Sequence, residues 1–288
     1  MTVDKIRVSN PTIPANYAER LTHAVNDGFI SSSSPYVMEF EREMAGLCSR
    51  QYALSCCSGT QALDIAIKAL DLKPATEVII PNFCIVSALT SVLNNELIPR
   101  FADPSDGYNI TIEDLLPLVT NKTGAIIVAH MYGLAVDMAP IQEFCKNQNI
   151  YLIEDAAEAH GQSANNQMCG SFGDISIFSF FSNKHVTCGE GGMCLTDNAN
   201  LAKRIAEIKN LYFDLERSYR HSQVGQVGRM STMQAVLGTC SLAILEHSIL
   251  RKRTIGDIYS KLLSEKIQLP PTKNKVSNNH YWVYPIAF

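Results

Sequence analysis

Short apolar runs alternate along this chain with segments whose apolar positions recur at the period of an α-helix. The runs are typical of buried strands and lie at residues 77–81, 97–102, 124–129, 150–154, 175–180 and 193–196. The periodic segments predict helices at residues 36–47, 60–70, 113–119, 138–146, 199–210 and 231–263, the last of them broken near its middle. This alternation predicts an α/β fold with a mostly parallel central sheet and helices on both faces.

The pattern changes after residue 263. A polar, proline-bearing stretch follows at residues 269–272, and a new strand is predicted at residues 281–284, close to the last residue. We therefore expect residues 1–245 to form a large α/β domain and residues 246–288 to begin a smaller C-terminal domain that is incomplete.

The composition is that of an ordinary globular protein. The 288 residues are 46% hydrophobic and carry a net charge of −4, which gives no case for a nucleic-acid partner. No eighteen-residue apolar span is present, so no membrane helix is expected, and the first five residues lack the apolar region of a secretion signal. The nine cysteines are scattered without ligand spacing, which favours reduced, buried thiols in the cytoplasm over disulfides or a metal site.

A single lysine follows the most aromatic of the predicted strands. Lys184 comes shortly after residues 175–180 and precedes a turn that contains Gly189, Gly191 and Gly192. Beside the apolar end of a strand a lysine loses hydration, so its pKa falls and the neutral amine can attack a carbonyl. This is the chemistry of a Schiff-base lysine. The alternative is an ordinary solvated lysine.

Further polar residues stand where predicted strands end, which is where ligands bind in such sheets. Residues 58–60, Ser-Gly-Thr, precede a helix whose free N–H groups can bind an anion, although Ser and Thr there are also common helix caps. Asp155 could pair with a ring nitrogen or cap the next helix, and Ser179 could bind a phosphate or a neighbouring carbonyl. His130 and Tyr132 end another strand, where such residues are more often structural than catalytic.

Pyridoxal phosphate needs several of these features together. A helix N-terminus holds its phosphate, a carboxylate keeps its pyridine nitrogen protonated, and a lysine holds its aldehyde. Residues 58–60, Asp155 and Lys184 occur in that order along the chain. The combined pattern predicts a pyridoxal-phosphate enzyme.

The sequence also resembles the DegT/DnrJ/EryC1/StrS sugar aminotransferases, which have the aspartate aminotransferase fold (fold type I), over residues 11–284. The matching motifs lie at residues 30–32, 40–41, 58–63, 130–133, 154–161, 178–192 and 229–230. Within that family the chain most resembles the perosamine synthetase group, which aminates C4 of a nucleotide-linked 4-keto-6-deoxy sugar. The resemblance implies a pyridoxal-phosphate-dependent transaminase that uses glutamate as donor, forms a homodimer with shared active sites and serves surface polysaccharide synthesis.

The resemblance also implies roles for single residues. Lys184 would hold the cofactor's aldehyde as a Schiff base and shuttle a proton, and Asp155 would pair with the pyridine nitrogen. Glu158 would lie near the cofactor's 3-oxygen. Related dehydratases carry a histidine in place of the lysine, and the register of the preceding aromatic residues assigns that position to Lys184 rather than to His185.

The phosphate of the cofactor has its own implied contacts. Gly59, Thr60 and Gln61 would bind it, largely through backbone N–H groups, and Ser179 would add its hydroxyl. No metal ligand is implied.

Two residues depart from the family pattern. Ile85 stands where relatives place an aromatic ring over the cofactor, so that aliphatic packing or Phe83 would have to replace it. Val227 stands where relatives have an asparagine that reaches the partner subunit's phosphate, which predicts a weaker contact. Family members also continue beyond residue 288. A second hypothesis is therefore a truncated or degenerate relative that binds the cofactor or dimerises without turnover, and that leaves apolar surface uncovered at a strand around Trp282.

Overall fold

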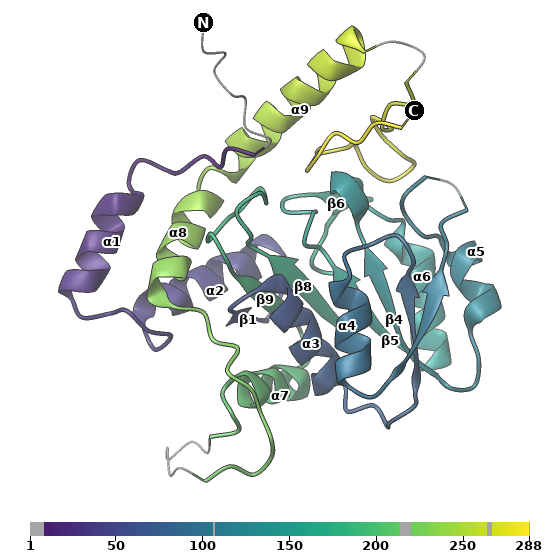
Figure 1. Ribbon diagram of the computed structural model, residues 1–288, viewed down its shortest axis with the longest axis horizontal. Coiled ribbons are helices and arrows are strands. Elements are labelled where there is room, and N and C mark those ends of the chain that lie inside the picture. Colours follow the sequence, from purple (N-terminus) through teal and green to yellow (C-terminus); the bar gives the residue numbers. More distant parts are fainter. Residues whose placement is uncertain (1–8, 106, 214–219, 264–266, 288) are drawn as a thin grey trace, which may run out of the picture.

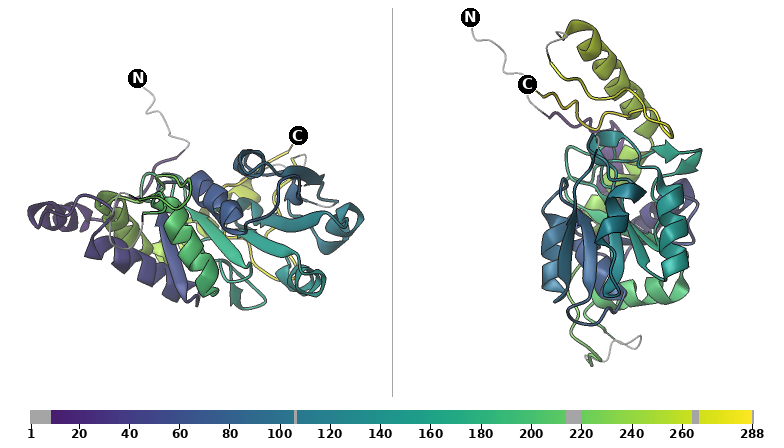
Figure 2. Two further views of the ribbon diagram at one scale, coloured as in Figure 1. Left: turned by 90° about the horizontal axis from the view of Figure 1, so that it is seen from below. Right: turned by 90° about the vertical axis from the view of Figure 1, so that its right-hand side faces the viewer.

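The computed structural model describes residues 9–105, 107–213, 220–263 and 267–287. The N-terminal residues assessed above for a secretion signal lie outside these ranges. The described chain forms a layered α/β structure in which helices cover both faces of a central sheet, while helix α9 (Leu245–Leu262) extends beyond it (Figures 1 and 2).

The central sheet is mostly parallel, as predicted. Its seven strands are β1 (Tyr52–Cys56), β2 (Glu77–Pro81), β3 (Ile98–Ala102), β4 (Thr123–Ala129), β5 (Tyr151–Asp155), β8 (Ile175–Ser179) and β9 (Gly192–Thr196). Their spatial order is β1-β9-β8-β5-β4-β2-β3, and β9 alone runs against the others. The sequence pattern misses β1, because only the last two residues of this edge strand are buried. It also misses a hairpin of β6 (Ser163–Ala164) and β7 (Gln167–Met168).

Alternate residues of the strands face two separate cores. On β2, Ile79 faces one core, whereas Val78 and Ile80 face the other. The first core includes residues of α2 (Pro35–Leu47), α6 (Met138–Gln148) and α8 (Thr232–Leu242). The second includes residues of α3 (Gly59–Ala69), α4 (Ser87–Asn94) and α7 (Ala199–Lys209). A strand buried on both faces needs apolar residues at every position, which is why these strands read as continuous apolar runs.

The remaining helices are short or lie at the surface. The helix expected at residues 113–119 is an α-helical turn, α5 (Ile112–Leu115), followed by a 3₁₀ turn, η1 (Leu116–Leu118). A second 3₁₀ turn, η2 (Met131–Gly133), follows β4. The sequence pattern misses α1 (Tyr17–Asn26), which buries a single residue, and α4, whose eight residues are rich in Ser and Thr.

The long C-terminal helix is broken near its middle, as predicted. Helices α8 and α9 are separated at residues 243–244 and bent by 63°. No single described helix is long and apolar enough to cross a membrane, and only this bent pair taken together passes by length and composition. Most of α8 is buried in the protein core.

The predicted strand at residues 281–284 is wrong. Tyr281 has a φ of +51°, which no strand allows, and the segment folds back over the loop after β4. The backbone N–H groups of His280 and Trp282 donate to the carbonyls of Gly133 and Tyr132, both at 3.1 Å. Tyr281 is buried and Trp282 is partly buried against the protein, whereas Val283 and Ile286 remain exposed. In Figure 1 this yellow segment lies beside α9, at the end of the sheet where β4 and β5 finish.

Candidate active site

A cavity of about 320 Å³ opens at the carboxyl ends of the parallel strands. Its lining comes mainly from the segments after β1, β2, β4, β5 and β8 and from the C-terminal segment. Seven of the predicted site residues line it, namely Gly59, Thr60, Ile85, Asp155, Glu158, Ser179 and Lys184. Gln61 does not, although it was predicted with them.

The N-terminus of α3 forms one wall. The Ser58 hydroxyl caps the helix by accepting the N–H of Gln61 at 3.1 Å, which uses the group predicted to reach a phosphate. Within the described part of the chain, the N–H groups of Gly59 and Thr60 have no acceptor. Helix N-termini with free N–H groups attract anions. The predicted anion site therefore rests on these two N–H groups.

Gly59 allows this wall to approach the end of β8 closely. A Cβ atom at this position would lie 2.6 Å from the Cβ of Ser179, closer than atoms can pack. The Ser179 side chain is thereby held against the first turn of α3. The hydroxyl of Thr60 lies 2.6 Å from that of Ser87, a neighbouring residue of the lining that the sequence did not single out.

Lys184 reaches the cavity from the loop after β8. Its Nζ lies 3.8 Å from Oε1 of Glu158 and 3.7 Å from the centre of the Trp282 ring. Burial lowers the pKa of its amine, against the opposing effect of Glu158 and Asp155. The direction of this shift is the one expected for a lysine beside the apolar end of a strand.

Two carboxyl groups face this amine. Burial raises the pKa of Asp155, which ends β5, and among the described residues only the N–H of Ala157 donates to its carboxylate. Burial also raises the pKa of Glu158 to about 7, and its Oε2 accepts the N–H of Tyr132 at 2.7 Å. Asp155 is therefore a buried acid that lacks a full set of partners, so a cationic group in the cavity would stabilise its charged form.

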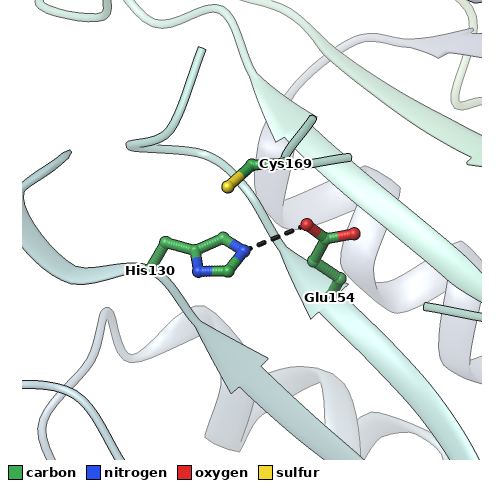
Figure 3. Close-up of side chains that lie close together, drawn as sticks. All are labelled: His130, Glu154 and Cys169. Atoms are coloured by element: carbon green, nitrogen blue, oxygen red, sulfur yellow. Dashed lines mark hydrogen bonds and ion pairs between the residues drawn. The ribbon is translucent and has the colours of Figure 1, made fainter. Parts of the chain in front are cut away.

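A third buried acid, Glu154, precedes Asp155 in β5. Figure 3 shows His130, Glu154 and Cys169 close together, in an arrangement that could by distance hold a metal ion. Nδ1 of His130 accepts the N–H of Val136 at 3.0 Å, so Nε2 carries the proton and donates to Glu154, also at 3.0 Å.

Glu154 is already fully bonded. Its two oxygens also accept the N–H groups of Gly170 and Phe172 and the hydroxyl of Ser176. Burial acts to raise its pKa, but these donors together with His130 hold it below its usual range. These bonds join β4, β5 and β8, so the cluster supports the strands, although His130 also lines the cavity.

Of the two residues that depart from the family pattern, Ile85 lines the cavity and Val227 does not. Ile85 lines the cavity although 60% of its surface is exposed, while Phe83 is outside the lining and stacks on Tyr108. Val227 is exposed and pairs with Asn210 in an isolated bridge, outside the cavity lining.

Sequence reasoning missed Trp282 as a site residue. It lines the cavity from the C-terminal segment, and it is the only tryptophan of the chain. The only signal that marks it is its place in the aromatic stretch at residues 281–284, and that signal does not say which part of the protein it covers.

Comparisons with known proteins place these features in context. The sequence matches the DegT/DnrJ/EryC1/StrS aminotransferase family over residues 11–288. A GDP-perosamine synthase of Escherichia coli O157:H7 is 34% identical over 282 residues, which span 98% of this chain and 77% of that protein. A UDP-N-acetyl-3-dehydro-alpha-D-glucosamine 3-aminotransferase of Acidithiobacillus ferrooxidans is 36% identical over 233 residues, 80% of this chain and 63% of that protein. The crystal structure of DesI with its TDP-sugar product superposes with a TM-score of 0.87 at 28% identity, over 96% of this chain and 70% of that one.

Proposed function

The chain belongs to the DegT/DnrJ/EryC1/StrS aminotransferase family, and from this we propose that it transfers the amino group of glutamate to the 4-keto carbon of a nucleotide-linked 4-keto-6-deoxy sugar. The observation that carries the proposal is the buried amine of Lys184, which shares one cavity with the carboxylate of Asp155 and the free N–H groups of α3. The similarity to a GDP-perosamine synthase over 98% of the chain supports the choice of sugar.

Pyridoxal phosphate is the cofactor of this family, and the residues of the cavity fit it. The N–H groups of Gly59 and Thr60 lack acceptors within the described chain, and an anion such as a phosphate would satisfy them. Asp155 lacks a cationic partner that a protonated ring nitrogen would supply. When bound, pyridoxal phosphate supplies an aldehyde that takes up the amino group and a ring that accepts the electrons released.

Lys184 is the residue that we propose for proton transfer. Burial favours its neutral form, and a neutral amine can take a proton from the reacting carbon and return it. Glu158 lies 3.8 Å from that amine and is the nearest carboxyl group, so it stabilises the protonated form that results.

Asp155 and the N-terminus of α3 are proposed to bind and orient. Asp155 is buried at the end of β5, where its carboxylate would hold a proton on the ring nitrogen in place. Gly59 and Thr60 would bind the phosphate through their N–H groups, and Ser179 would add its hydroxyl. Ile85 would supply aliphatic contact where relatives place an aromatic ring.

The proposal extends to the partners of the reaction. Ile85, Val86 and Phe181 leave apolar surface exposed at or next to the mouth of the cavity. A second copy of the chain would cover such surface, which supports a homodimer with shared active sites. Sedimentation analysis of the purified protein tests this directly.

The proposed function can be tested by the visible absorbance of the bound cofactor. The full chain, purified with pyridoxal phosphate, is expected to absorb visible light and to lose that band when glutamate is added. A nucleotide-linked 4-keto-6-deoxy sugar added next should restore it, because the amino group then leaves the cofactor.

Two lysine variants sharpen this experiment. Lys184→Ala should abolish both changes, whereas Lys203→Ala, at an exposed position on α7 with 75% of the side chain in solvent, should leave them intact. A colourless protein, or a Lys184→Ala protein that behaves like wild type, contradicts the proposal and favours a relative without turnover.

A second candidate substrate is a nucleotide-linked 3-keto sugar, because the A. ferrooxidans 3-aminotransferase is 36% identical over 80% of the chain. Incubating the glutamate-treated protein with each keto sugar separates the two. NMR of the product identifies whether the new amine is on C3 or C4.

A further inference from the structure

The C-terminal segment places an aromatic ring directly over the amine of Lys184. The Nζ atom lies 3.7 Å from the centre of the Trp282 ring and 3.8 Å from Oε1 of Glu158. We propose that Trp282 is a positioning residue for Lys184, whose ammonium form it holds over the face of its indole and against Glu158. The inference deepens the proposed function and rests on it for the role of Lys184.

Trp282 is fixed on several sides. Its indole N–H donates to the carbonyl of Asn183, the residue before the lysine, at 3.0 Å. Its ring stacks on that of Tyr132 with an interplanar angle of 15°, and its backbone N–H donates to the Tyr132 carbonyl. Lys252 of α9 donates to the Trp282 carbonyl at 3.0 Å. A ring held at its edge, its face and its backbone cannot turn away from the amine without breaking these contacts.

The same contacts join both groups that face the amine. Tyr132 stacks on Trp282 and also gives its backbone N–H to Glu158, in a left-handed conformation with φ of +58°. Tyr132 therefore fixes the Glu158 carboxylate and the Trp282 indole relative to each other. Lys184 lies between them, and its loop is tied to the indole through Asn183.

A lysine side chain has many rotamers, and confining it costs entropy. An aromatic face attracts a cation without being able to take a proton from it. Trp282 can therefore hold the charged amine against Glu158 without competing for its proton, and Asp155 stays free for its own partner. Four charged or titratable groups interact electrostatically with the Lys184 amine, namely Asp155, Glu158, His160 and His185. A fifth, Lys252, donates to the carbonyl of Trp282.

A merely packing role predicts a different response to substitution. Trp282→Leu keeps apolar bulk over the lysine but removes the aromatic face, and Trp282→Phe keeps a ring but removes the bond to Asn183. If the ring stabilises the ammonium form, the leucine variant should lower the pKa of the Lys184 amine by about one unit, and the phenylalanine variant by less. If the ring only excludes water, its loss should leave that pKa unchanged or raise it.

The pKa can be measured without turnover. In the cofactor-free full chain, the rate of reductive methylation by formaldehyde and cyanoborohydride is followed at the Lys184 peptide by mass spectrometry, between pH 6 and pH 11. Modification of Lys203 in the same digest is the internal control and should not shift. An unchanged or raised pKa in Trp282→Leu overturns the proposal.

A second measurement leaves Trp282 in place, so that no folding defect can obscure it. Because the chain has one tryptophan, its fluorescence reports on this ring alone. The emission should change as the Lys184 amine loses its proton, and that change should vanish in Lys184→Met. The same titration curve in wild type and Lys184→Met overturns the proposal.

The outcomes separate this inference from the proposed function. A shifted pKa together with a protein that glutamate does not bleach would support the positioning role and reject the transaminase. An unshifted pKa in a protein that glutamate does bleach would reject the positioning role and support the transaminase.

Discussion

The carboxyl group of Glu158 gives a quantitative test of how burial controls the site. Burial raises its pKa from 4.5 to about 7, and the nearby amine of Lys184 and the N–H of Tyr132 only partly oppose this. In the cofactor-free protein, Glu158→Gln keeps the size of the side chain and removes its titration. The variant should therefore become more stable relative to wild type as the pH rises.

The sign and size follow from the two pKa values. Below pH 4.5 the group is protonated in both the folded and the unfolded chain. As the pH rises toward 7 the unfolded chain ionises first, so the stability contributed by the neutral group is lost through this window and stays lost above it. The full loss corresponds to about 3 kcal/mol, of which about 2 kcal/mol falls between pH 5 and pH 8.

Urea unfolding followed by circular dichroism at pH 5, 6, 7 and 8 measures this difference. The buried His185 and His280, whose pKa values are lowered to about 3 and about 4, add a loss of stability toward acid in both proteins, which cancels in the comparison. Glu207→Gln, at a surface position on α7, is the matched control for the loss of one carboxyl group. A difference between Glu158→Gln and wild type that stays flat within about 0.5 kcal/mol would refute the reasoning.

Three further substitutions test other parts of the site. Gly59→Ala should weaken binding of pyridoxal phosphate at least tenfold, about 1.4 kcal/mol, because the added methyl collides with the end of β8; Gly46→Ala, with open space around its Cβ, is the control in the same absorbance titration. Asp155→Asn should keep the cofactor but slow the glutamate-driven colour change at least ~100-fold, since an amide cannot hold the ring proton; a loss below about tenfold contradicts this role. His130→Ala leaves the buried carboxylate of Glu154 without its ring donor and should cost about 3–5 kcal/mol in urea unfolding; a cost under about 1 kcal/mol would show that the cluster is not a support.

Much of the fold is visible in the sequence because its signals are local. Buried parallel strands such as β2 and β4 need an apolar residue at each position, and helices such as α3 show their own period. Where an element gains little from burial, as in α1 and β1, the pattern is weak and the sequence does not reveal it. The strand expected at residues 281–284 failed because this segment bonds to the loop after β4 and buries Tyr281 there rather than in a sheet.

The site residues, too, are predicted from the sequence where local position decides and missed where side-chain contacts decide. Asp155 ends a strand, Lys184 and Gly59 follow strands, and all three line the cavity because parallel strands end at one edge of the sheet. Gln61 also follows that rule, yet its N–H is taken by the cap of Ser58, a choice that depends on one side-chain rotamer.

The sequence by itself determined the α/β fold, the family and most of the residues that line the cavity, since these depend on patterns within short stretches of chain. Only the tertiary structure decided the raised pKa of Glu158, the support that His130 gives to Glu154, and the contact between Trp282 and Lys184. Burial, and the distance between residues far apart along the chain, are properties of the folded protein. No local pattern encodes them.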